Sequence, residues 1–127
     1  MQCSFRVILF IKKDVQKSFI LSLEDVEGTL YLFIFVSDSQ EIMKIIQSVK
    51  PDLFLVEGQL PCMTGLYIYD LLHATRRLKD VPALLLCENK LDDEMAQRIA
   101  KRQMHVQVKP YVLPELLDRI EAICVSS

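Results

Sequence analysis

Five short apolar runs alternate with amphipathic segments along the chain. They are FRVILFI at 5–11, LYLFIFV at 30–36, LFLV at 53–56, PALLLC at 82–87 and VQV at 106–108. Consecutive residues of a strand point to opposite faces, and in most of these runs the residues of both faces are apolar. That pattern is typical of strands covered on both faces. We therefore predict five buried strands.

The segments between these runs carry apolar residues at helical spacing. These residues are Val15, Phe19 and Leu23, then Ile42, Ile45, Ile46 and Val49, then Ile68 and Leu72, then Met95 and Ile99, and finally Leu113, Leu116, Leu117, Ile120 and Cys124. Asp38 or Ser39 can cap the second helix, and Asp92 with Asp93 lies favourably at the start of the fourth. The pattern predicts one helix after each strand.

Strands that alternate with helices in this way are joined by right-handed crossovers and run parallel. We predict a single α/β domain over residues 1–127. Its five-stranded parallel sheet would be covered by helices on both faces, as a (βα)5 three-layer sandwich. The flavodoxin-like strand order 2-1-3-4-5 is the natural choice for five such units.

Charge and composition exclude several classes of function. The net charge is −2, which does not favour capture of nucleic acid or of an anionic membrane. The longest apolar run, 30–36, is too short to cross a bilayer, and the first residues lack the order of a signal peptide. Cys3, Cys62, Cys87 and Cys124 show no metal-binding spacing. We expect a cytoplasmic protein with reduced thiols.

Two segments resemble the receiver domain of the response regulators in two-component signalling. KPDLFLVEGQLPCMTG at 50–65 is similar to that family's third strand and the loop after it. VQVKPY at 106–111 is similar to its fifth strand and the Lys-Pro pair that follows. The likeness extends from Phe5 to about Val125. It implies the same fold and a place in phosphorelay signal transduction.

The resemblance also implies structural roles for three residues. Pro61 and Gly65 stand at the family's spacing in the loop after the third strand. Pro110 follows Lys109 in the Lys-Pro pair, whose peptide bond is usually cis in that family.

The positions that carry phosphoryl chemistry in receivers hold different residues here. Two adjacent acids that hold magnesium are replaced by Lys12 and Lys13, and the phosphorylated aspartate by Glu57. The hydroxyl residue after the fourth strand is replaced by Cys87. Lys109 alone matches the active-site pattern.

Two further details concern the register of the lysines after the first strand and the residue at the family's switch position. A shift of one residue would place Lys13 and Asp14 at the acidic positions, but the uninterrupted strand ending at Ile11 favours Lys12 and Lys13. The aromatic switch residue of the fifth strand is replaced by Val106, which has no ring.

These replacements predict a degenerate site without catalytic activity. Magnesium needs hard oxygen ligands, and two ammonium groups would repel it, so we expect neither magnesium nor another cofactor. Glu57 reaches one methylene farther than aspartate, and Cys87 is a weak hydrogen-bond donor. We expect Glu57 to be an anion held by Lys12 or Lys13 and by Lys109. The alternative is that it only neutralises these lysines.

The function implied is that of a phosphorylation-independent pseudo-receiver that binds a protein partner. The resemblance points to the face formed by the fourth helix, fifth strand and fifth helix, where a homodimer could also form. The residues expected there are Arg98, Lys101, Arg102, His105, Val106 and Gln107. Such a basic face suits an acidic partner. Two alternatives remain open: a working phosphoacceptor with an unusual site, and an anion or small-ligand sensor that uses the lysines.

Overall fold

The computed structural model describes residues 5–57, 65–88 and 91–126. In chain order the elements are β1 (Phe5–Ile11), β2 (Phe19–Glu24), β3 (Leu30–Val36), α1 (Ser39–Ser48), β4 (Leu53–Glu57), α2 (Gly65–His73), the 3-10 helix η1 (Arg76–Leu78), β5 (Ala83–Cys87), α3 (Asp93–Arg102), β6 (His105–Val108) and α4 (Leu113–Ser126). No helix within this described part is long and apolar enough to span a bilayer.

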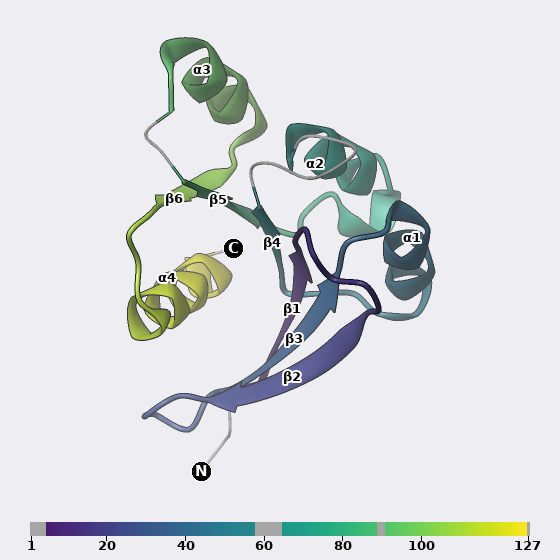
Figure 1. Ribbon diagram of the computed structural model, residues 1–127, viewed down its shortest axis with the longest axis vertical. Coiled ribbons are helices and arrows are strands. Elements are labelled where there is room, and N and C mark those ends of the chain that lie inside the picture. Colours follow the sequence, from purple (N-terminus) through teal and green to yellow (C-terminus); the bar gives the residue numbers. More distant parts are fainter. Residues whose placement is uncertain (1–4, 58–64, 89–90, 127) are drawn as a thin grey trace.

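A six-stranded sheet with the order β2-β3-β1-β4-β5-β6 forms the centre of the molecule (Figure 1). Within it, β3, β1, β4, β5 and β6 run parallel to one another. They coincide with the five predicted apolar runs, and among themselves they have the flavodoxin-like order 2-1-3-4-5. The predicted α/β fold class is therefore confirmed, with one additional strand.

That additional strand, β2, corrects the prediction of a first helix. The segment expected to place Val15, Phe19 and Leu23 on a helical face instead forms a strand that pairs antiparallel with β3. A spacing of four residues is also a multiple of two, so Phe19 and Leu23 equally share one face of a strand, together with Leu21. The apolar spacing alone therefore could not separate the two structures.

A tight turn between β2 and β3 explains why the hairpin forms. The Asp25 carboxylate accepts hydrogen bonds from the amides of Glu27 and Thr29, both at 2.9 Å. Gly28 has a φ of 87°, a left-handed conformation that favours glycine. An aspartate followed closely by a glycine is a turn signal that the helical interpretation overlooked.

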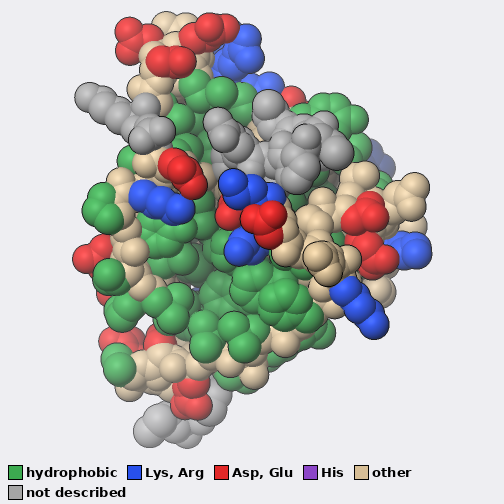
Figure 2. All heavy atoms as spheres, viewed as in Figure 1, with side chains coloured by type: hydrophobic (Ala, Val, Ile, Leu, Met, Phe, Trp, Pro, Cys, Tyr) green, Lys and Arg blue, Asp and Glu red, His purple; other side chains and the backbone are tan. Residues whose placement is uncertain are grey.

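Helices cover the two faces of the sheet unequally (Figure 1). The core on one face is built with residues of α1, α2 and α3, whereas the core on the other face is built with α4. The missing first helix therefore leaves part of the α4 face uncovered. Figure 2 shows hydrophobic side chains reaching the surface between α4 and the β2 edge.

The four remaining helices follow the predicted pattern. Ile42 and Ile46 of α1 are buried, as are Leu116, Leu117 and Ile120 of α4. The predicted caps also form: the Asp38 carboxylate accepts from the amide of Gln40, and the Asp92 carboxylate from that of Met95. These bonds satisfy amides at the helix starts that have no partner within the helix.

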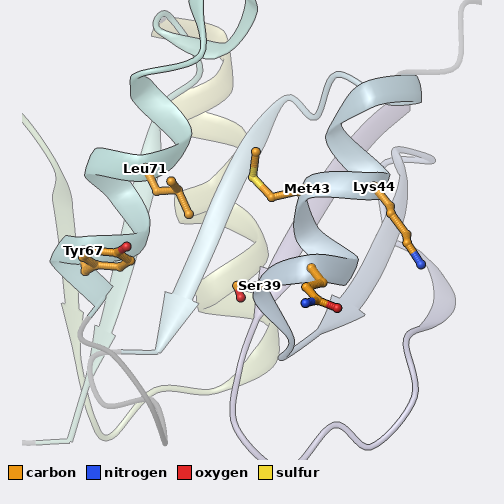
Figure 3. A pocket seen from close by; sticks show the side chains of 6 residues that line it. Ser39, Met43, Lys44, Tyr67 and Leu71 are labelled. Carbon is orange, nitrogen blue, oxygen red and sulfur yellow. The ribbon is translucent and has the colours of Figure 1, made fainter.

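A groove of about 400 Å³ lies between α1 and α2 (Figure 3). Its lining residues are Ser39, Gln40, Met43, Lys44, Tyr67 and Leu71. Met43 and Tyr67 are exposed apolar side chains within it.

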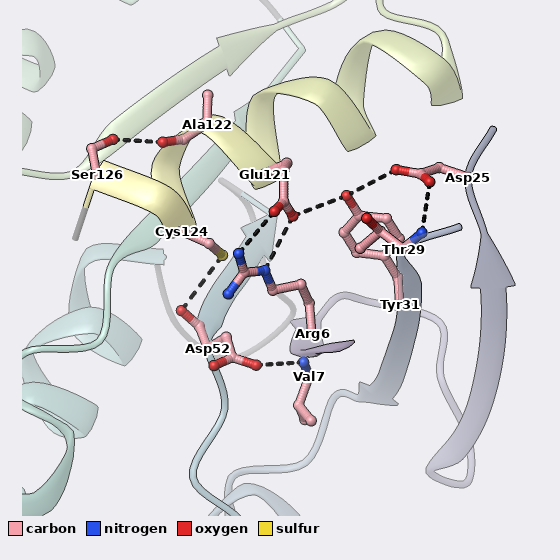
Figure 4. A network of polar contacts seen from close by, with 10 residues as sticks. All are labelled: Arg6, Val7, Asp25, Thr29, Tyr31, Asp52, Glu121, Ala122, Cys124 and Ser126. Carbon is pink, nitrogen blue, oxygen red and sulfur yellow. Dashed lines mark hydrogen bonds and ion pairs between the residues drawn. The ribbon is translucent and has the colours of Figure 1, made fainter. Parts of the chain in front are cut away.

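A polar network fastens α4 to β1 and β3 (Figure 4). The Arg6 guanidinium donates to both carboxylate oxygens of Glu121, with Nη2–Oε1 at 2.8 Å and Nε–Oε2 at 3.1 Å. The buried Tyr31 hydroxyl donates to Glu121 Oε2 at 3.1 Å. The hydrogen bond from Arg6 holds the pKa of Glu121 below its ordinary value, while burial and the nearby Glu121 charge raise the pKa of Tyr31.

We predict that Glu121→Gln lowers the free energy of unfolding by about 1 to 2 kcal/mol at neutral pH. The effect is modest because the ion-paired side chains of Arg6 and Glu121 are only partly buried. Because the folded pKa of Glu121 is lowered, its contribution is complete above the ordinary value of 4.5 and is lost as the pH falls through the folded pKa. Urea melts should therefore show a difference in the free energy of unfolding between parent and variant at neutral pH. In acid this difference should disappear. Asp118→Asn, at an exposed position of the same helix, is the matched control.

Candidate functional site

The predicted site residues follow four neighbouring strands at the same edge of the sheet. The register pairs Ile11 with Val56, Glu57 with Leu86, and Cys87 with Val108. Since parallel strands end at one edge, the segments after β1, β4, β5 and β6 meet there. Lys12, Lys13, Glu57, Cys87 and Lys109 all lie at or just beyond these strand ends.

Glu57 is bound by the backbone of the segment after β1. Its Oε2 atom accepts a hydrogen bond of 2.8 Å from the backbone amide of Lys13. The preceding amide, of Lys12, donates to the carbonyl oxygen of Val36 at 3.0 Å. Asp14 then takes a left-handed conformation with φ 67°. The carboxylate thus fixes the course of the chain as it leaves β1.

The expected pairing of Glu57 with lysine side chains is not what the structure shows. The Lys109 ammonium lies 3.3 Å from Glu88 Oε1, and the Lys12 ammonium lies over the Phe10 ring, 5.8 Å from its centroid. Among the described residues, no ion pair joins Glu57 to a lysine. Lys109 pairs instead with Glu88, which follows β5 directly. The sequence interpretation overlooked Glu88, although an acid after an apolar strand was the signal that identified Glu57.

Cys87 lies at the end of β5 and is only 8% exposed. Burial raises the pKa of its thiol above the ordinary value, so the thiol is protonated at neutral pH. Its backbone carbonyl accepts from the amide of Lys109 at 3.0 Å. Val106 is half-buried and packs against the same core as Cys87. Both side chains therefore belong to the packing of the sheet.

The residues at this edge do not fit a magnesium ion. The family's acidic positions hold Lys12 and Lys13, and the Glu57 carboxylate is already engaged by an amide. Within the described ranges, no group of three His, Cys, Asp or Glu side chains is arranged to hold a metal. No step through a metal follows from this arrangement.

The structural positions at the edge are only partly described. Gly65 begins α2 directly against β4 and β5: a Cβ there would lie 2.7 Å from Leu85 Cδ1 and 3.1 Å from the carbonyl oxygen of Glu57. The peptide bond between Lys109 and Pro110 is cis. Pro61 lies outside the described residues.

The face formed by α3, β6 and α4 is less basic than the sequence suggested. Arg102 makes a two-pronged ion pair with Asp70 of α2, with Nε–Oδ1 at 2.8 Å and Nη2–Oδ2 at 2.9 Å. Arg98 pairs with Glu94 on its own helix at 2.7 Å. Asp70 was not singled out from the sequence, because nothing in the local pattern shows that α2 and α3 lie side by side. Two of the predicted cations are therefore neutralised within the domain.

The remaining predicted residues of this face differ in character. Lys101 and His105 are exposed, and Gln107 accepts a hydrogen bond from Arg119 at 3.3 Å. Burial, followed by the charge of Arg119, holds the pKa of His105 below its ordinary value. His105 is therefore mostly neutral at physiological pH, and the positive charge of this face that no ion pair among the described residues offsets lies on Lys101 and Arg119.

Solved structures show the same fold at low sequence identity. The receiver domain of the Francisella response regulator 1452 is 13% identical, with 95% of this chain and 98% of that chain covered and a TM-score of 0.66. The chemotaxis response regulator CheY4 of Vibrio cholerae is 17% identical, with 94% and 99% covered and a TM-score of 0.63. The receiver domain of a histidine kinase from Syntrophus aciditrophicus is 19% identical, with 95% and 91% covered and a TM-score of 0.69.

No family model matches the sequence, and no curated protein matches it either. The structural likeness nevertheless covers nearly the whole chain in each case. The chain thus has the fold of response-regulator receiver domains, as the resemblance of its motifs implied.

We predict that the Glu57 contact depends on an acceptor atom and not on a negative charge. Glu57→Gln keeps an oxygen for the Lys13 amide and should change the free energy of unfolding by less than about 1 kcal/mol, whereas Glu57→Ala should lower it by about 1 to 2 kcal/mol. Denaturant melts and hydrogen exchange of the Lys13 amide measure both effects. An equal loss in the two variants would instead show that the charge of Glu57, and so pairing with a cation, stabilises the fold.

Gly65→Ala should destabilise the domain by about 1 to 3 kcal/mol, because the new methyl group overpacks the contact with Leu85 and with the backbone of β4. A double-mutant cycle with Leu85→Ala tests the cause. If Leu85 is the obstacle, the combined loss is smaller than the sum of the two single losses. Additive losses would place the strain elsewhere.

Proposed function

We propose that this chain is a non-enzymatic, cytoplasmic receiver-like module of two-component signalling that acts by binding protein partners without accepting a phosphoryl group. The receiver fold supports the signalling role, and the chemistry of the strand edge supports the loss of phosphorylation. The observation that carries the proposal is the Glu57 carboxylate, which is bound by the Lys13 amide in a segment that offers lysines instead of acids.

Phosphoryl transfer to a carboxylate depends on positioning and on cancelling charge at the transferring oxygens. A metal ion normally supplies much of that cancellation, and it needs oxygen ligands that Lys12 and Lys13 do not provide. The buried thiol of Cys87 is a weak donor in place of a hydroxyl group. Nucleophile, metal ligands and hydroxyl donor are thus all replaced at once.

For the partner, we propose a protein that binds the face of α3, β6 and α4. This face presents the exposed Lys101 together with Val112 and Leu113 at the start of α4, which are exposed apolar residues. A cation at one end of β6 and exposed apolar side chains at the other suit a protein surface that carries both acidic and hydrophobic residues. The net charge of −2 does not favour nucleic acid or an anionic membrane.

We predict that magnesium with beryllofluoride, a phosphoryl mimic, leaves the amide spectrum of the protein unchanged around Glu57 and Lys109. A matched variant, Lys12→Asp/Lys13→Asp/Glu57→Asp, restores the acidic pattern and should acquire saturable, magnesium-dependent shifts. NMR titration of both proteins makes the comparison. Saturable shifts in the parent that spread into β6 would contradict the proposal.

Inorganic phosphate alone, without metal, provides the second arm of the same titration. Its result separates a protein-binding module from a sensor of anions. Saturable shifts at Lys12, Lys13 and Lys109 would favour the anion sensor, whereas an unchanged spectrum supports binding of protein partners.

A further inference from the structure

The outer strand β2 displays a stack of aromatic rings on the α4 face of the sheet. The ring centroids of Phe19 and Phe35 lie 4.6 Å apart, and those of Phe35 and Phe10 lie 5.1 Å apart. Phe19 is 50% exposed and Leu21 is 45% exposed. The stack lies beside the part of the face that α4 covers, so a large apolar surface faces solvent here.

The opposite side of the same strand is apolar as well. Ile20, which pairs with Ile34 of β3, is 65% exposed and points to the other face of the sheet. Within the described residues, β2 pairs only with β3, so its outer edge has free backbone donors and acceptors. Natural edge strands usually carry a charged residue, a proline or a bulge that prevents pairing with another chain. Between Lys17 and Glu24 this strand has none of these.

Charge is distributed unevenly along the hairpin. Lys17 precedes β2, whereas Glu24 ends it and Asp25 and Glu27 follow in the turn. The strand is therefore basic at its start and acidic at its end. An antiparallel neighbour of the same sequence would bring each basic start beside an acidic end.

From these features we propose that β2 is a dimerisation edge, which pairs antiparallel with β2 of a second copy of this chain. In the symmetric register, a two-fold axis passes beside Leu21, which then contacts Leu21 of the second copy. Phe19 lies opposite Leu23 of the second copy, and Lys17 lies opposite its Asp25. Residues directly opposite in an antiparallel pair point to the same face, so this register joins the apolar side chains of both copies.

A second copy fits this surface better than a helix docked on the aromatic stack. A helix there would cover Phe19 and Leu21, but it would leave Ile20 and the free strand edge in solvent. A paired strand satisfies the free backbone donors and acceptors of the β2 edge. It also packs beside the exposed side chains on both faces of the sheet. β6 lies at the opposite edge of the sheet, so both copies would keep their α3, β6 and α4 faces free for partners.

Sedimentation of the whole chain over a wide range of concentration tests the proposal. The expected result is a reversible dimer that weakens as salt is added. Leu21→Lys places two ammonium groups at the axis and should raise the dissociation constant at least about tenfold. Leu113→Lys is the matched control, because Leu113 is 48% exposed and lies near the partner face. It should leave the dimer unchanged.

Charge reversal then tests the antiparallel arrangement. Lys17→Glu should weaken the dimer, because it places a carboxylate opposite Asp25 of the second copy. Glu24→Lys is the matched charge reversal and should leave the dimer nearly unchanged, because Glu24 lies opposite the uncharged Ser18 in this register. Asp25 is kept, since it holds the turn. Circular dichroism and melts check that every variant is folded.

A monomer at all concentrations would overturn the proposal. So would a dimer that Leu113→Lys dissociates while Leu21→Lys does not, or one that Glu24→Lys weakens as much as Lys17→Glu does. These outcomes are independent of the magnesium titration, so failure of the dimer and failure of the proposed function are distinguishable.

Discussion

Burial of both faces of the central strands is the constraint on which the rest of the structure depends. Every residue from Leu53 to Val56 and from Ala83 to Cys87 is buried, so β4 and β5 need helices on each side. That requirement imposes parallel strands with crossover helices and three layers. In β4 and β5 it also leaves only the strand ends for polar groups. Glu57 and Glu88, which belong to the candidate site, lie at the ends of these two strands.

At that edge, two of the charged groups have local partners. Glu57 binds the Lys13 amide, and Lys109 binds Glu88. A site made for phosphoryl transfer keeps its carboxylates clustered against mutual repulsion, and a metal ion offsets the cost. Here a lysine and a backbone amide lie beside the two carboxylates of Glu57 and Glu88. This arrangement fixes the course of the chain as it leaves β1.

The sequence predicts the elements that depend on burial. It does not predict the contacts that join segments distant in the chain. The five parallel strands, the four observed helices and the caps at Asp38 and Asp92 could be predicted, since apolar spacing and capping are local. β2 could not be distinguished from a helix, because a spacing of four fits both. The Lys109–Glu88 pair and the Arg102–Asp70 pair depend on how neighbouring loops and helices meet. No local pattern contains that information.

Replacement of one helix by a strand changes how such a domain can be regulated. A conformational switch needs a ligand that makes different contacts in two states. Cys87 and Val106 are packed into one core, which under the proposed function leaves a ligand at the edge little to move. Association acts differently, because a partner that binds only the folded, paired form shifts the population by mass action. If β2 pairs with a second copy and the face of α3, β6 and α4 binds a partner, as proposed, the concentration of the protein itself becomes a variable to which the module responds.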